Sequence, residues 1–294
     1  SYAGLLGAWQ TLDGAGIEHV GTGWDLADAR EPAYVDAGDA TVGFVSATSS
    51  FYGEAIAGQT ARGDRRPGVN PIRTRHVVGE ADWDDTVETA HQRGQSAIRR
   101  NGDELLVRPP GLGYPMRHFR LETDLDPGEN YTEVLPRDVR GLTDAVSQAK
   151  RTADTVVVHV HAHEYAVGGE MDDPPTFLRE LAHTVVDEGA DAVVSQGTHT
   201  LRGAEVYDGA PVFYDLNGLF RMQTRGRQPR QSQLRITPED DYESVNVTDE
   251  SDFLGGTGVV PVFTATDDGV ETVALHAIRR EEGIPRLLDG PDTR

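Results

Sequence analysis

The sequence predicts an α/β fold, because helical and strand patterns alternate along most of its 294 residues. Residues 40–47 (ATVGFVSA) form a nearly continuous apolar run, of the kind that is buried on both faces of a parallel sheet. Residues 155–160 (TVVVHV) form a second strand pattern, with one helical pattern before it and another after it.

The chain begins with a helical pattern. Apolar residues between positions 5 and 12 recur at helical spacing, and a turn with glycines at positions 14 and 16 ends the pattern. Residues 17–20 then predict a short strand, and residues 25–30 predict a second helix. A helix that leads into a strand is consistent with the α/β fold.

Residues 53–137 lack a sustained pattern. This stretch is rich in Gly, Pro and Arg, and it shows one helical pattern at residues 84–99. We interpret it as a long insertion or loop region over the core. Loops of this length in a compact domain are usually functional or disordered, and the sequence does not choose between the two.

Regular alternation returns after this region. One apolar helical face spans residues 139–149, and a wider apolar stripe spans residues 177–186, with two prolines before it and Gly189 after it. Further strands are expected at residues 191–195 and 212–216. This half of the chain therefore predicts the parallel part of the sheet.

The last part of the chain predicts a surface excursion and a closing pair of strands. Residues 223–256 are polar and have no periodicity. Residues 257–280 predict an antiparallel hairpin, because two strand patterns are joined by Asp267-Asp268-Gly269. No internal repeat or linker divides the chain, so we expect a single domain over residues 1–294.

The chain is strongly acidic. It has 49 Asp and Glu residues against 27 Lys and Arg residues, a net charge of −22, and Lys150 as its only lysine. Such a surface repels nucleic acid, so we expect no nucleic-acid partner. The composition favours a halophilic protein that works at high ionic strength. The alternative is an ordinary acidic cytosolic or secreted protein.

The sequence leaves the compartment and the oligomeric state open. No apolar run reaches the roughly 18 residues that span a bilayer. No segment with basic residues followed by an apolar run opens the chain, as a signal peptide would. As given, the chain is therefore expected to be soluble. The first residue is Ser1 rather than Met, so an upstream export signal or anchor would not be visible. The chain has no cysteine, so a metal would be held by His, Asp, Glu or Asn.

The segment VVVHVHAHEY, residues 156–165, carries the strongest chemical signal. Side chains alternate along a strand, so His159, His161 and His163 are expected on one face as the strand runs out into a loop. Imidazoles followed by Glu164 at the carboxyl end of a strand can hold Zn, Mn or Fe and activate a water. The alternative is a surface histidine cluster that solvent satisfies.

A second signal is SQGTHTLRGAEVYDG, residues 195–209. Gly197 allows a tight turn that presents His199 toward the same sheet edge, where His161 and His199 could share an ion. Alternatively, His199 only hydrogen-bonds its own loop. Arg202 and Glu205 either form a structural pair or face a substrate. A third segment, PVFYDLNGLF at residues 211–220, by itself indicates only a strand and a turn.

Together, and in this order, these segments resemble the CapA family of poly-γ-glutamate capsule synthesis proteins, which has a calcineurin-like metallophosphoesterase fold. The resemblance covers residues 4–51 and 139–220. It implies a β-sandwich flanked by helices, in four α/β/β/α layers. The blocks that carry it are GLLGAWQTLDGAGIEHVGTGWDLADAREP, ATVGFVSATSSF, ADTVVVHVHAHEY and EGADAVVSQGTHTLRGAEVYDGAPVFYDLNGLF.

The resemblance also implies roles for individual residues. His161 and His199 match positions expected to bind a divalent metal, which would be Mn, Zn or Fe. The expected catalytic residues are His163 and Glu164. The residues expected at the substrate are Arg202, Glu205, Tyr207 and Asn217.

Three departures from the family pattern stand out. Gln196 occupies a position where the family usually has a histidine, and Asn217-Gly218 reverses the usual Gly-Asn order. The family's opening strand that ends in Gly-Asp and its NNHxxDxG block have no counterpart here. We therefore expect the N-terminal strands to be missing and the metal site to be incomplete.

The implied function is synthesis of a capsule, poly-γ-glutamate or another cell-envelope polymer, with a metal-dependent hydrolase site of the phosphoesterase type. Its substrate would be an envelope polymer or a small phosphorylated molecule, its partners would be other envelope polymer-synthesis proteins, and the family is usually envelope-associated. The alternative is a degenerate, non-catalytic member that binds a polymer or a partner. A third hypothesis is a truncated gene product that folds poorly.

Overall fold

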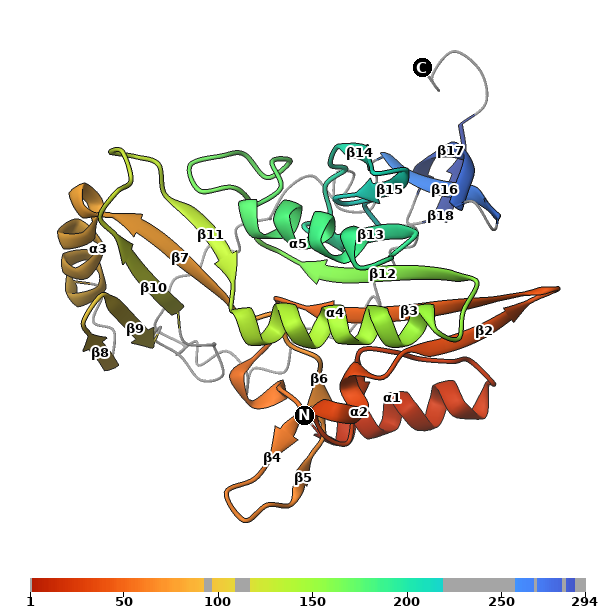
Figure 1. The fold of residues 1–294 in the computed structure, drawn as a ribbon, viewed down its shortest axis with the longest axis horizontal. Coiled ribbons are helices and arrows are strands. Elements are labelled where there is room, and N and C mark those ends of the chain that lie inside the picture. Colours follow the sequence, from red (N-terminus) through yellow and green to blue (C-terminus); the bar gives the residue numbers. More distant parts are fainter. Residues whose placement is uncertain are drawn as a thin grey trace.

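A six-stranded sheet forms the centre of the molecule (Figure 1). The structure is a computed structural model that describes residues 2–92, 97–108, 117–218, 257–266, 269–281 and 284–288. The strand order is β14-β15-β13-β12-β3-β2; the four inner strands are parallel, and both edge strands are antiparallel. The strands are β2 (Ala33–Ala37), β3 (Ala40–Thr48), β12 (Thr155–Ala162), β13 (Ala192–Gly197), β14 (Ala204–Tyr207) and β15 (Ala210–Phe213).

The sequence-based predictions agree with most of this sheet. The runs at 40–47, 155–160 and 191–195 correspond to β3, β12 and β13. The strand predicted at 212–216 begins earlier, at Ala210, and ends at Phe213. The sequence analysis missed both edge strands, β2 and β14. The predicted α/β architecture is confirmed.

Two helices, α4 (Pro136–Lys150) and α5 (Thr176–Asp187), cover one face of this sheet (Figure 1). Both were predicted from their apolar stripes. They bury the alternate residues Val156, Val158 and Val160 of β12 in the main core. Because side chains alternate along a strand, His159 and His161 lie on the opposite face, away from the helices.

Val158 tests the strength of this core. Its side chain is fully buried, whereas that of Val206 on the edge strand β14 is 70% exposed. Val158→Ala is expected to lower the free energy of unfolding by about 2 kcal/mol, because it removes buried methyl groups and leaves a void. The matched change Val206→Ala should stay within about 0.5 kcal/mol of the unmodified chain. Urea denaturation of both variants measures the difference, and equal losses would contradict this packing.

The described part of residues 53–137 contains a second sheet, so the interpretation of this region as a long loop is wrong, whereas its interpretation as an insertion stays a prediction. The order of the strands in this sheet is β11-β7-β10-β9-β8, and α3 (Glu80–Gln92) packs against it through Trp83. This helix begins four residues before the predicted start at 84. The strands are β7 (Thr74–Gly79), β8 (Ala97–Asn101), β9 (Glu104–Arg108), β10 (Arg117–Glu122) and β11 (Tyr131–Val134). Before them come η1 (Gly53–Ala55), β4 (Gly58–Gln59), β5 (Arg65–Arg66) and β6 (Gly68–Val69).

A buried carboxylate joins the two sheets. Asp138, in the first turn of α4, is 1% exposed and accepts hydrogen bonds from two guanidinium groups. Arg73, next to β7, donates from Nε (2.7 Å) and Nη2 (2.5 Å), and Arg30, at the end of α2, donates from Nη2 (3.2 Å). Asp138 therefore ties the second sheet and α2 to the helix layer of the central sheet.

The N-terminal region follows the prediction except for one strand. The predicted helices are present as α1 (Tyr2–Gly14) and α2 (Leu26–Arg30), and Asp25 caps α2 by accepting hydrogen bonds from two backbone N–H groups. The strand predicted at 17–20 is wrong, because the chain first pairs at β1 (Thr22–Gly23), with β6. Gly21 has a φ of +84° and turns the chain between residues 17–20 and β1. The residues that were predicted as a strand therefore lie before the residues that pair.

The C-terminal region contains the predicted hairpin. β16 (Thr257–Thr266) pairs antiparallel with β17 (Gly269–Glu281), and β18 (Ile284–Leu287) adds a third strand. The surface excursion predicted at 223–256 lies outside the described residues, and the single-domain expectation stays a prediction. Among the described helices, none combines the length and the apolar character needed to cross a membrane.

Candidate functional site

Three histidines gather at one edge of the central sheet. β12 and β13 are parallel neighbours, with His161 opposite Gln196 in the register, so their carboxyl ends meet at the same edge. The ring centroids of His161 and His163 are 4.7 Å apart, and those of His163 and His199 are 6.0 Å apart. The structure thus brings together three imidazoles that the sequence placed on two separate segments.

The turn after β13 explains how His199 reaches this edge. Gly197 has a φ of +149°, and a Cβ there would lie 2.3 Å from the carbonyl oxygen of Ala162. Only glycine fits so close to β12. His199 itself has a φ of +61°, which turns the chain back over the end of the sheet. The tight turn expected at Gly197 is confirmed.

A buried carboxylate that the sequence analysis missed fixes this turn. Asp215 is 1% exposed and accepts hydrogen bonds from the backbone N–H of Thr198 (2.9 Å), the hydroxyl of Thr198 (2.8 Å) and the backbone N–H of Asn217 (2.8 Å). The Asn217 side chain donates to the carbonyl oxygen of Thr257. The structure thus gives Asn217 a role in linking β15 to β16. The sequence signal that could have identified Asp215 is its position as an acidic residue directly after the apolar run PVFY.

Burial keeps the strand histidines neutral. It lowers the pKa of His161, and the neighbouring His163 and His199 lower it further, whereas Asp215 opposes the shift. Burial, with a smaller contribution from His161, lowers the pKa of His159 to about 4. The Nδ1 atom of His159 lies 3.0 Å from the hydroxyl of Ser46 on β3. His159 therefore joins two strands as a neutral side chain.

The loop after β12 is held from both sides. The hydroxyl of Ser49 donates to Glu164 Oε2 at 2.7 Å. Arg202 is 5% exposed and donates from Nε to the carbonyl oxygen of Met171 (3.0 Å) and from Nη2 to that of Glu164 (2.7 Å). Arg202 thus positions the loop that carries Glu164. Its guanidinium binds backbone oxygens and not Glu205, so Arg202 and Glu205 do not form the structural pair that the sequence left open.

Two of the residues expected at the substrate lie elsewhere. Glu205 Oε1 lies 2.8 Å from Nε2 of His183 on α5 and accepts a hydrogen bond from the Tyr214 hydroxyl at 2.5 Å. Tyr207 stacks on the ring of His183 at 3.8 Å and donates to Asp187. These contacts hold β14 to α5 on the helix side of the sheet. The structure therefore does not bring Glu205 and Tyr207 to the histidine cluster, because alternation along β14 turns both toward α5.

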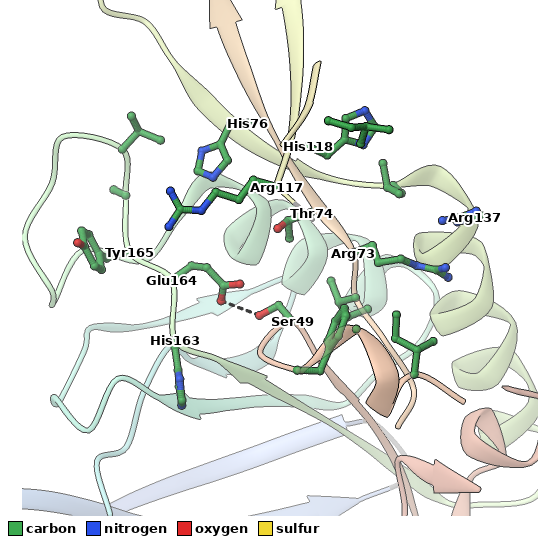
Figure 2. Close-up of a pocket in the computed structure, with 18 of the residues that line it drawn as sticks. Ser49, Arg73, Thr74, His76, Arg117, His118, Arg137, His163, Glu164 and Tyr165 are labelled. Carbon is green, nitrogen blue, oxygen red and sulfur yellow. Dashed lines mark hydrogen bonds between the residues drawn. The ribbon is translucent and has the colours of Figure 1, made fainter. Parts of the chain in front are cut away.

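A cavity of about 750 Å³ adjoins the cluster. It lies where the loop after β12 meets β7 and β10 of the second sheet, and Figure 2 shows Glu164 and Ser49 on one side of it and His76 and Arg117 on another. His163 also lines it, at its edge, with the ring directed away from Glu164 and Arg117. The sequence analysis missed this cavity, because half of its wall comes from the region that was interpreted as a long loop.

His76 makes the stability of this region depend on pH. Burial lowers its pKa, and the charge of Arg117 lowers it further. A histidine whose pKa is lower in the folded state binds protons less readily than in the unfolded chain, so the folded state loses stability as the pH falls below about 6.5. The free energy of unfolding should therefore drop less between pH 7 and pH 5 in His76→Gln than in the unmodified chain. Identical pH profiles in urea denaturation would contradict this.

The described residues do not fit a resident metal ion by themselves. Two imidazoles at the spacing of His161 and His163 could share an ion, but catalytic zinc sites draw on three protein ligands. Within the part of the chain that the structure describes, no three His, Cys, Asp or Glu side chains are arranged to hold one ion. Gln196, the neighbour of His161 in the register, supplies no imidazole.

Comparison with known proteins places the chain in a family. The model of the family described as "Bacterial capsule synthesis protein PGA_cap" matches residues 1–220. The protein y4sH of Sinorhizobium fredii is 30% identical over 219 residues, which are 74% of this chain and 45% of that protein. The chain thus spans less than half the length of this relative.

Two shorter matches lie within the same family. The "PGA biosynthesis protein CapA" of Bacillus subtilis is 40% identical over 89 residues, 30% of this chain and 22% of that protein. The "Capsule biosynthesis protein CapA" of Bacillus anthracis is 35% identical over 79 residues, 26% of this chain and 18% of that protein. The family has a metallophosphoesterase-like fold, as the resemblance implies. The chain therefore belongs to the family of bacterial capsule synthesis proteins PGA_cap.

Proposed function

We propose that this chain works in the synthesis of a capsule or another cell-envelope polymer, and that its histidine cluster carries out a hydrolytic step on the polymer or on a phosphorylated precursor. The observation that carries this proposal is the convergence of His161, His163 and His199 beside a ligand-sized cavity. The names of the two CapA relatives, a PGA biosynthesis protein and a capsule biosynthesis protein, support the biological setting.

The proposed step uses acid–base chemistry. A water oxygen attacks the ester phosphorus, the bond to the leaving oxygen breaks, and a base takes the proton of the water and returns it to that leaving oxygen. We assign this proton transfer to His163, because it belongs both to the cluster and to the cavity wall. Glu164, which also lines the cavity, accepts a hydrogen bond from Ser49 and would orient the water.

The role of His161 and His199 in this proposal is to position His163. Their rings flank it, and the turn that carries His199 is fixed by Asp215. The resemblance to the family implies Mn, Zn or Fe at His161 and His199. The described residues by themselves do not complete such a site, so the proposed step uses side chains alone.

Turnover of simple phosphate esters tests the hydrolytic part. The purified chain is incubated with p-nitrophenyl phosphate and bis(p-nitrophenyl) phosphate, without metal, with Mn²⁺, Zn²⁺ or Fe²⁺, and with a chelator. We expect release of p-nitrophenol above the buffer rate, and elemental mass spectrometry of the same preparation measures bound metal. No turnover of either ester under any of these conditions would contradict the proposal.

A second candidate function is binding without catalysis. Gln196 beside His161, and the lack of a third ligand in the described part of the chain, favour it. In this case the cavity would hold an envelope polymer or a partner, and the histidines would have no chemical role. Polymer production in cells should then be unchanged by the double variant His161→Ala/His199→Ala, whereas impaired production would contradict this candidate.

A further inference from the structure

The cavity beside the histidine cluster has the size of a ligand site. Its volume of about 750 Å³ lies within the range of about 300–1,000 Å³ that is usual for small-molecule pockets. It is bounded by the loop after β12 on one side and by β7 and β10 on another (Figure 2).

The charge of the cavity wall is opposite to that of the whole chain. The chain has a net charge of −22, yet the wall contains three arginines, Arg73, Arg117 and Arg137, and only one carboxylate, Glu164. In such an acidic protein, a wall with more arginines than carboxylates indicates a place that accepts a negative group.

The three arginines differ in their availability. Arg73 is occupied by Asp138, to which its Nε and Nη2 both donate. Arg137, at the start of α4, lies on the other side of the view in Figure 2; like Arg117 it is exposed and forms no hydrogen bond or ion pair with a residue that the structure describes. Arg117 extends into the space between His76 and Glu164, and it forms no hydrogen bond or ion pair with any residue that the structure describes.

The charges around Arg117 do not balance. Arg73 is paired with Asp138, which leaves Arg117 and Arg137 on the cavity wall against one carboxylate, Glu164, and no ion pair joins Glu164 to either arginine. The pKa of His76 is lowered by burial and by Arg117, and no carboxylate acts on it in the opposite direction. The space between these groups therefore has a positive potential that a bound anion would satisfy.

Six apolar side chains form another part of the wall, beside polar ones such as Thr74, His118 and Tyr165. The apolar ones come from the loop after β3, from β9, from the residues that flank β7 and β11, and from the loop after β12, so a ligand would bury an aliphatic part next to its charged end. These apolar side chains are Phe51, Ile56, Ile72, Leu106, Leu135 and Val167.

We propose that this cavity binds an oxyanion, a carboxylate or a phosphate, carried on a short aliphatic stretch, with Arg117 as the cationic partner of the anion. This inference rests on the proposed function in that it names the ligand class of the same site. A ligand can bind without being turned over, so the two proposals can fail separately.

The test is calorimetric titration of the chain with glutarate, butyl phosphate and inorganic phosphate at one low ionic strength. Glutarate carries a carboxylate and butyl phosphate carries a phosphate, each on an aliphatic stretch. Glutaramide is the uncharged control for glutarate and has a similar shape. Arg117→Gln should weaken binding of the anions about tenfold or more, because it removes a charge-assisted hydrogen bond. Arg62→Gln, the same change on an exposed arginine at the tip of the β4–β5 hairpin, should leave binding unchanged.

The probes also distinguish the two sources of the anion. Tighter binding of glutarate indicates a carboxylate ligand, and tighter binding of butyl phosphate indicates a phosphorylated one; either result supports the proposal. Added salt should weaken both, because Arg117 is exposed. No measurable binding of any anion, equal binding of glutaramide, or equal affinities in Arg117→Gln and Arg62→Gln would overturn it. Anion binding by a chain that hydrolyses no ester would remove only the proposed chemistry.

Discussion

His163→Ala is expected to lower the rate of phosphate-ester hydrolysis by about 10²- to 10⁴-fold, the usual contribution of a positioned acid–base group. His163 is the imidazole that the cluster and the cavity share, 4.7 Å from His161 and 6.0 Å from His199 between ring centroids. Its loss removes the proton transfer, whereas the cavity that binds the substrate remains. The decrease should therefore appear in kcat more than in KM.

The matched control for this variant is His276→Ala. His276 is exposed on β17 and does not line the cavity. It should retain the rate of the unmodified chain. Equal rates in His163→Ala and the unmodified chain would show that the observed turnover does not use the cluster, and equal losses in both variants would indicate a general effect of replacing a histidine.

Asp138→Ala is expected to lower the free energy of unfolding by about 3–5 kcal/mol, the usual result of removing one partner of a buried ion pair. The carboxylate of Asp138 is fully buried and accepts hydrogen bonds from Arg30, from the Arg73 guanidinium and from the Arg73 backbone N–H. Without it, two partly buried guanidinium groups lose their counter-charge at the junction of the two sheets. Urea denaturation measures the loss.

Asp144→Ala is the control for that change, because Asp144 is an exposed aspartate on the same helix. It should lie within about 0.5 kcal/mol of the unmodified chain. If Asp138→Ala were no less stable than Asp144→Ala, the carboxylate would not be the link between the second sheet and α4. The cavity would then need another explanation for how its two walls are held together.

The central sheet was predictable because its strands are buried. β3, β12 and β13 are apolar runs, and α4 and α5 each have an apolar stripe that packs on one face of this sheet. The second sheet was not predictable in the same way. β10 (RHFRLE) carries charged residues on one face, and Arg120 pairs there with Glu122 and Glu133. Short strands whose outer face is made of ion pairs have no long apolar run, so their sequence resembles a loop.

The candidate site was predictable where it follows from a single strand. His161, His163 and Glu164 directly follow the apolar residues of β12, and Gly197 indicated the turn that leads to His199. The cavity depends on how residues 53–137 fold back on the loop after β12, which no local pattern contains. The positions of Glu205 and Tyr207 depend on β14, a short edge strand whose direction the sequence did not reveal.

The central claim is that the histidine cluster and the basic cavity form one site. Nuclear magnetic resonance of the imidazole groups, recorded during titration with butyl phosphate, tests it most directly. The account predicts that the signals of His76 and His163 shift together with a single affinity, whereas that of His276 stays in place. Shifts confined to His76, shifts of His276 of equal size, or no shift in any of them would contradict it.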